Sequence, residues 1–179
     1  SFDLLLDKFQ NNRTLSMATL GVLVLLTVNP ARYIVMNHDY PYTYFNLFVG
    51  GVNGAFGQYE TDYWGVSVKQ AIEEMDKRGY FPEGDTVMVV SHFSYSLQKY
   101  IQNKYNGRVK TGYVRYYQRY NKEWDYGIFP TRYIGAGLLN SGNWPDSRSL
   151  FTIDADGIPL LSVDQGGGSI FAGERALAA

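Results

Sequence analysis

The feature that most limits what this chain can fold into is an apolar run, Leu15–Val28, which carries no charged side chain (LSMATLGVLVLLTV). On its own the run is shorter than the ~20 apolar residues that a membrane-spanning helix usually needs. Continuing through Pro30 and Arg32 to Met36 gives enough length. An arginine near a helix end can reach the interface, and proline is tolerated in membrane helices. We therefore predict a membrane helix; a buried core helix and a signal peptide are the alternatives.

The residues before this run also carry a pattern. Phe2, Leu5, Leu6 and Phe9 recur at helical spacing with polar residues between them, which indicates a short amphipathic helix on a membrane or against a partner. We assign residues 1–36 to this segment and the membrane helix. Basic residues lie on both sides of the apolar run, so the sequence gives little indication of its orientation.

The stretch Tyr40–Gly65 is rich in aromatic residues and glycines. A phosphate-binding loop would need a lysine soon after its glycines, and the first one is Lys69, so we expect an ordered loop held by aromatic anchors. Because the stretch follows the membrane helix directly, five of its aromatic residues should settle at headgroup depth and form an exposed apolar patch. They are Tyr40, Tyr42, Tyr44, Phe45 and Phe48.

The pattern of residues 37–165 predicts a small α/β domain with one mixed sheet. Helical and strand-like segments alternate, and the chain then ends in antiparallel strands. The expected helices are Trp64–Arg78 and Phe93–Tyr105, and the expected strands are Thr86–Val90, Val109–Tyr117, Tyr126–Ile134, Phe151–Ile153 and Ile158–Val163. The composition of residues 166–179, with three consecutive glycines and several alanines, suggests a flexible tail.

Composition excludes several classes of function. The net charge of −1 does not favour nucleic acid as a partner, because binding a phosphate backbone needs clustered basic residues. The chain has no cysteine and only two histidines, which argues against thiolate chemistry and multi-histidine metal sites. Its 16 tyrosines are typical of membrane interfaces and of surfaces that contact sugars or proteins.

The candidate substrate-binding residues are Glu60, Asp62, Tyr63 and Trp64. Two carboxylates on one face of an extended segment could orient a sugar hydroxyl or hold a divalent cation. The alternative is structural, because carboxylates commonly cap the start of a helix such as the one expected from Trp64. Asp125 and Arg132 are expected to form a structural ion pair.

The dipeptide Ser91-His92 could suggest a nucleophile and a base. No Gly-x-Ser-x-Gly motif surrounds it, and adjacent residues cannot by themselves place the two side chains as a relay. We therefore expect Ser91 to cap the helix that follows and His92 to lie in its first turn. A soluble enzyme that acts through these residues is a third class of hypothesis.

Four segments, in order, resemble the region after the last membrane helix of certain bacterial GT-C glycosyltransferases, which are similar to protein O-mannosyltransferases and to the aminoarabinose transferases of lipid A. The resemblance covers roughly residues 30–163. The segments are the Tyr/Gly-rich stretch from Tyr42 to Gly65, Trp124–Phe129, Asn140–Pro145 and Asp156–Pro159.

This resemblance implies an enzyme that moves a sugar from a polyprenyl-phosphate donor to an acceptor at the outer face of a bacterial inner membrane. Its catalytic carboxylate would lie in a region near the N-terminus of such enzymes that this chain does not contain, so no catalytic residue is expected here. The expected partners are the rest of the membrane enzyme, the lipid bilayer and a lipid-linked sugar. The rival hypothesis is a non-catalytic periplasmic module that binds a sugar or a protein.

Overall fold

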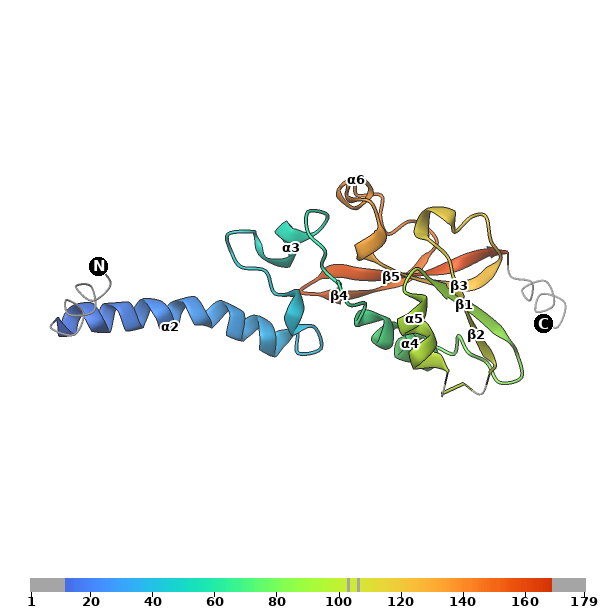
Figure 1. Cartoon of the computed structure of the whole chain (residues 1–179), viewed down its shortest axis with the longest axis horizontal. Helices are drawn as coiled ribbons and strands as arrows, with labels where there is room; N and C mark the ends of the chain where they lie inside the picture. The colour runs from blue at the N-terminus through green and yellow to red at the C-terminus, as the bar shows by residue number, and fades with distance from the viewer. Residues whose placement is uncertain (1–11, 103, 106, 169–179) are drawn as a thin grey trace.

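A computed structural model describes residues 12–102, 104–105 and 107–168. A long N-terminal helix, α2 (Arg13–Met36), leads into a small α/β domain, and the helix projects away from that domain (Figure 1). The fold class predicted from the sequence is therefore confirmed. The expected amphipathic helix near the N-terminus lies outside the described residues.

Helix α2 has the dimensions of a membrane span. It begins after Asn12, whose side-chain oxygen accepts the Leu15 N–H at 3.1 Å, and it continues through Pro30. Its 24 residues extend about 36 Å, against about 30 Å for the hydrocarbon core of a bilayer. None of its most apolar window is buried by the domain, so the buried-core interpretation is wrong for this chain. Length and composition alone also fit a signal sequence.

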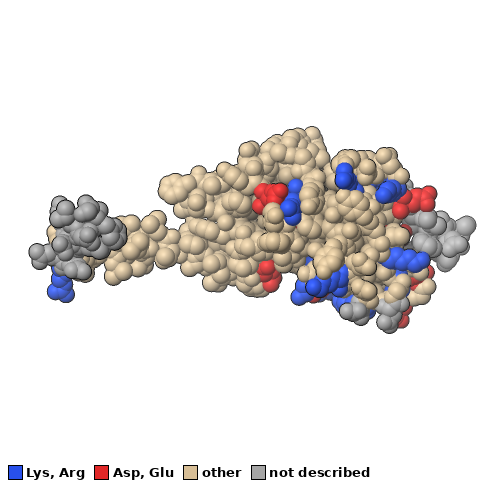
Figure 2. Space-filling model, in the orientation of Figure 1, with Lys and Arg blue, Asp and Glu red and all other residues tan. Residues whose placement is uncertain are grey.

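Charged side chains are distributed differently over the helix and the domain. In Figure 2 the charged side chains gather on the domain and at the far end of the helix, whereas the middle of α2 shows none on this face. Between Arg13 and Met36 the only charged residue is Arg32. The helix therefore presents an apolar surface that the described part of the domain does not cover.

The domain is built on a five-stranded mixed sheet with the order β2-β1-β3-β5-β4. Strand β1 pairs in parallel with both β2 and β3, whereas β5 pairs antiparallel with β3 and β4. The bounds are β1 Val87–Ser91, β2 Val109–Tyr113, β3 Trp124–Pro130, β4 Ser149–Ala155 and β5 Ile158–Gly168.

Alternating residues of β1 point into two separate cores. Val87 and Val89 pack with helices α4 (Ser67–Lys77) and α5 (Ser94–Ile101), whose apolar stripes bury Met75 and Leu97 completely. Val90 instead joins the second core, which contains the aromatic side chains Tyr116, Trp124, Phe129 and Trp144. Short helices cover this second face: η2 (Tyr116–Gln118), η3 (Thr131–Tyr133) and α6 (Ala136–Asn140).

Several predicted boundaries are corrected. The helix expected to reach Tyr105 ends at Ile101, and the strand expected to reach Tyr117 ends at Tyr113. The strand expected from Tyr126 to Ile134 runs from Trp124 to Pro130. The glycines after Gln165 continue β5: a Cβ at Gly166 would lie 1.7 Å from the Trp124 carbonyl oxygen, so glycine fits there. Residues 169–179 lie outside the described part.

The predicted Asp125–Arg132 ion pair is also wrong. Asp125 Oδ2 accepts the Met88 N–H at 2.8 Å and so joins β3 to the neighbouring strand. Arg132 instead lies 3.5 Å from Glu60, in the segment before α4. Each of these charged side chains therefore interacts with a group that is distant in the sequence and close only in the folded chain.

The stretch Tyr40–Gly65 is only partly the exposed patch that the sequence predicts. Tyr40 is buried in the first core and donates a hydrogen bond to Gln70 of α4, so it belongs to the domain interior. Tyr44 and Phe45 are half-buried, with Tyr44 packed edge-on against Tyr33 of α2. The exposed apolar part is smaller: Phe48 is 97 % exposed, and Leu47 beside it is also exposed.

In addition to the Tyr33–Tyr44 ring contact, two hydrogen bonds join the end of α2 to the domain. The Tyr33 hydroxyl lies 2.5 Å from Thr43 Oγ1 in η1 (Pro41–Thr43), and both side chains are buried. Asn37, which follows the last turn of α2, accepts the Asp156 N–H at 2.9 Å. Asp156 lies in the turn between β4 and β5, so this hairpin ends against the domain end of the helix (Figure 1).

Candidate functional site

The parallel strands determine where side chains can converge. Because β1, β2 and β3 run in the same direction, their carboxyl ends lie at one edge of the sheet. The chain passes from β1 to β2 on one side and then to β3 on the other. In α/β sheets, ligands bind outside the carboxyl ends of strands at such a change of direction.

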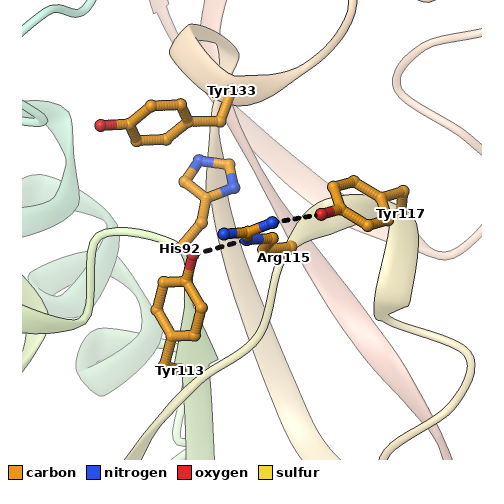
Figure 3. A pocket seen from close by; sticks show the side chains of 5 residues that line it. All are labelled: His92, Tyr113, Arg115, Tyr117 and Tyr133. Carbon is orange, nitrogen blue, oxygen red and sulfur yellow. Dashed lines mark hydrogen bonds between the residues drawn. The ribbon is translucent and has the colours of Figure 1, made fainter.

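A cavity of about 480 Å³ lies at this edge. Each of its lining residues follows or ends one of the parallel strands: His92 follows β1, Tyr113 ends β2, and Tyr133 closes η3 directly after β3. Arg115 and Tyr117 complete the lining (Figure 3). The cavity is therefore built by three segments that are distant in the sequence.

Arg115 forms the polar centre of the cavity. Its Nε donates to the Tyr113 hydroxyl at 2.9 Å, and its Nη1 donates to the Tyr117 hydroxyl at 2.6 Å (Figure 3). These bonds hold the pKa of Arg115 above its usual value. Since the guanidinium donates to both phenol oxygens, each tyrosine keeps its own O–H for another acceptor.

No carboxylate neutralises this group among the described residues: neither Arg115 nor Lys122 forms an ion pair there. The Lys122 ammonium lies 3.4 Å from the Tyr113 carbonyl and adds a second positive charge close to the cavity. The site therefore combines net positive charge with hydrogen-bond donors.

His92 forms the aromatic floor of the cavity. It is only 6 % exposed and packs against the rings of Phe93, Phe129 and Tyr133. Burial lowers the pKa of His92 to about 4, an effect that the nearby Pro130 carbonyl opposes only in part. Neither ring nitrogen makes a hydrogen bond of ordinary geometry to a described residue. The imidazole is therefore neutral at pH 7 and adds no charge.

Asp62, one of the predicted binding residues, is completely buried and has a structural role. Its carboxylate accepts hydrogen bonds from the Tyr42 hydroxyl at 2.7 Å, the Val66 N–H at 3.1 Å and the Ser67 hydroxyl. These bonds organise the turn that leads into α4. Burial and the Asp62 charge together raise the pKa of Tyr42.

Glu60, Tyr63 and Trp64 lie apart from the Asp62 carboxylate. Glu60 is exposed and pairs with Arg132, whose guanidinium lies 3.8 Å from the centre of the Tyr63 ring. Glu60 and Arg132 line a smaller cavity of about 160 Å³, whereas Trp64 is 68 % exposed. The structure therefore does not bring the two carboxylates together in one site.

The remaining candidates from the sequence are placed as follows. Ser91 ends β1 rather than capping α5, and its fully buried hydroxyl accepts the Phe93 N–H at 2.9 Å. It forms no hydrogen bond with the His92 ring, so the two residues do not make a relay. Among the described residues no group of three or more metal-ligating side chains occurs.

Four residues of this cavity are not among the binding residues predicted from the sequence: Tyr113, Arg115, Tyr117 and Tyr133. Tyr113, Arg115 and Tyr117 alternate within the second half of the predicted strand Val109–Tyr117, a spacing that places side chains on one side of an extended backbone. That signal was present in the sequence. The contribution of Tyr133 depends on the pairing of β3 with β1, which the sequence does not specify.

Comparison with known proteins gives no match among family models, curated proteins or solved structures. The resemblance to GT-C glycosyltransferases therefore remains a prediction from the motifs. Two of these motifs meet in the fold, because the Asn140 side chain donates to the Gly57 carbonyl at 3.2 Å.

Replacing Asp62 with alanine is expected to destabilise the protein by about 3 kcal/mol, because it leaves buried hydrogen-bond donors without an acceptor. The matched control is Glu60→Gln, which removes an exposed ion pair and should change stability by less than about 1 kcal/mol. Urea unfolding of the chain in detergent micelles measures both. Equal effects of the two substitutions would contradict the structural role of Asp62.

His92 is expected to make stability depend on pH. Its folded-state pKa of about 4 lies below the usual histidine value of 6.5, so the unfolded chain binds a proton more readily between these values. Stability from this residue is therefore complete above pH 6.5 and falls by about 3 kcal/mol as the pH drops to 4. The variant His92→Phe, measured against the parent by urea unfolding, should gain this amount on acidification.

Asp164 provides the internal comparison. Burial raises the pKa of Asp164 to about 6, so its contribution has the opposite sign and stability from it is lost as the pH rises through 6. The two contributions offset one another in the parent protein. Asp164→Asn should therefore lose stability relative to the parent on acidification, and variants that both follow the parent at every pH would refute these assignments.

Proposed function

We propose that this chain is the C-terminal, extracytoplasmic part of a polyprenyl-phosphate-dependent membrane glycosyltransferase, and that it supports sugar transfer without supplying the catalytic carboxylate. The observation that carries this proposal is the junction of an uncovered apolar helix with a domain whose cavity is lined by tyrosines. The order of the resembling motifs along the chain supports the same family.

The orientation of the sheet supports a role at the membrane. Strand β5 starts at the hairpin that touches the end of α2, and β3 runs antiparallel to β5, so the carboxyl ends of β1 to β3 point back toward the helix. The cavity consequently opens from the edge of the sheet directed toward α2. Leu47 and Phe48 add exposed apolar surface in a loop that runs back beside α2 (Figure 1).

The chemistry of the site favours binding over catalysis. Tyrosine rings offer apolar faces together with hydroxyl donors, a combination suited to sugars. The carboxylates predicted to bind substrate are engaged, Asp62 in the turn before α4 and Glu60 with Arg132. A catalytic carboxylate from elsewhere in the enzyme would therefore perform the transfer, with this domain holding a substrate or closing over it.

The alternative function is a non-catalytic extracytoplasmic module that binds a saccharide or a protein, and the same cavity without an acid–base pair favours it. The encoding gene discriminates between the two. An upstream stretch of about ten further membrane helices, each of spanning length, is expected for the transferase. A short upstream region would favour the module.

The direct test is sugar transfer by the intact gene product in membrane vesicles, measured with a radiolabelled polyprenyl-phosphate sugar. Removing the domain after Asn37 should abolish transfer while the remaining enzyme still inserts into the membrane. Transfer that continues without the domain, or an intact product that transfers no sugar, would overturn the proposal.

Membrane insertion of α2 gives a separate prediction. Replacing both Leu23 and Leu25 with lysine places two charges near the middle of the helix, at a cost of roughly 2.5–3.5 kcal/mol each. The double variant should become extractable by alkaline carbonate, whereas the parent and the control Leu23→Ile/Leu25→Ile should stay in the membrane pellet. Resistance of the lysine variant to extraction would contradict a spanning role.

A further inference from the structure

We propose that the cavity at the carboxyl edge binds the anionic group of a charged saccharide, with Arg115, Tyr113 and Tyr117 holding the anion. The role of this site in sugar transfer rests on the function proposed above, whereas the binding itself does not. The chemical class is a sugar that carries a phosphate or a carboxylate outside the membrane.

We infer an anion because the centre of the cavity has no negatively charged partner among the described residues. Arg115 is held by two phenol oxygens and by no carboxylate among the described residues. Each phenol oxygen already accepts a hydrogen bond from the guanidinium, so each O–H is left to donate to another acceptor. A group with several acceptor oxygens and a negative charge complements all of these donors, and charge-assisted hydrogen bonds of this kind are the strong ones.

The saccharide is inferred from the side chains that line the cavity. Apart from Arg115, the described residues that line the cavity are all aromatic, and His92 is neutral at pH 7 because it is buried. A volume of about 480 Å³ falls within the range of roughly 300–1,000 Å³ typical of small-molecule sites. A free inorganic anion would use the donors and leave the exposed tyrosine rings uncovered.

The position of the cavity argues for an anion in the aqueous phase. Ser91, which precedes His92, is level with Ile128 and hence with Val163 of β5, five strand steps from the start of β5 at the hairpin end. At about 3.4 Å per residue the cavity floor lies about 17 Å beyond the hairpin that contacts α2. Figure 1 shows β4 and β5 continuing away from α2 in nearly the same direction as the helix axis.

The headgroup layer of a bilayer is only about 5–8 Å thick on each side. A phosphate attached directly to a membrane lipid would therefore stay below the cavity. An anionic group on a sugar chain that extends from the membrane, or on a water-soluble saccharide, can reach it.

The test uses the full chain in lipid nanodiscs and four probes: glucose 1-phosphate, glucose, inorganic phosphate and polyprenyl phosphate incorporated in the bilayer. Binding is followed by NMR, through chemical-shift changes of the Arg115 side chain and of the tyrosine rings. Glucose 1-phosphate should bind at least tenfold more tightly than glucose and more tightly than inorganic phosphate. Its affinity should fall as ionic strength rises.

Two sets of variants assign the contacts. Arg115→Gln should weaken glucose 1-phosphate binding by tenfold or more, and Tyr113→Phe/Tyr117→Phe should weaken it severalfold while leaving the ring faces in place. The control is Lys110→Gln, which removes the same charge from β2 outside the cavity and should leave the affinity unchanged.

Each outcome decides the proposal. Equal affinity for glucose and glucose 1-phosphate, or an Arg115→Gln variant that binds as well as the parent, would overturn the anion site. Stronger binding of polyprenyl phosphate than of the soluble sugar phosphate would overturn the assignment to the aqueous phase. Arg115-dependent binding in a protein whose intact gene product transfers no sugar would uphold the site and refute only the proposed function.

Discussion

The parallel pairing of β1 with both of its neighbours is the constraint on which the rest of this structure depends. Parallel strands need crossover connections, so α5 must cover one face between β1 and β2. Their carboxyl ends must also meet at one edge, where the chain leaves each strand in a loop. Side chains from three separate segments converge there, around Arg115. The cavity is a consequence of strand direction.

The antiparallel half of the sheet gives that edge its orientation. The hairpin of β4 and β5 ends against Asn37, and Tyr33 is buried in the same junction, so the domain is held to the end of α2 by two separate contacts. Since β3 runs antiparallel to β5, the cavity opens toward the helix-bearing end of the domain. The uncovered apolar helix and the cationic, aromatic cavity therefore face the same end of the domain, an arrangement that supports the role proposed above in binding saccharides near a membrane.

The charged and titratable side chains of this domain differ in their burial and in their partners. Asp62 is buried because three donors surround it, whereas Arg119 is buried against Asp146 at 2.8 Å. His92 and Asp164 have no comparable partners among the described residues. Burial lowers the pKa of His92 and raises the pKa of Asp164, which favours the neutral form of each. Arg115 is different, because it is exposed and held by phenols alone. This contrast separates groups that stabilise the fold from Arg115, which we propose binds a ligand.

The sequence by itself determined the spanning-length helix, the helix expected from Trp64 and observed from Ser67, the buried strand before Ser91 and the final hairpin, because local periodicity and turn residues encode these elements. Only the tertiary structure decided what depends on partners distant in the chain. In the folded chain Tyr40 lies in the core, and Arg132 pairs with Glu60 rather than with Asp125. The tertiary structure also made Gly166 a strand residue and brought Tyr133 beside His92 and Arg115. The types of side chain in a short segment indicate whether that segment forms a helix, a strand or a turn. The residues that meet at a site depend instead on the order and direction of the strands, which a short segment does not specify.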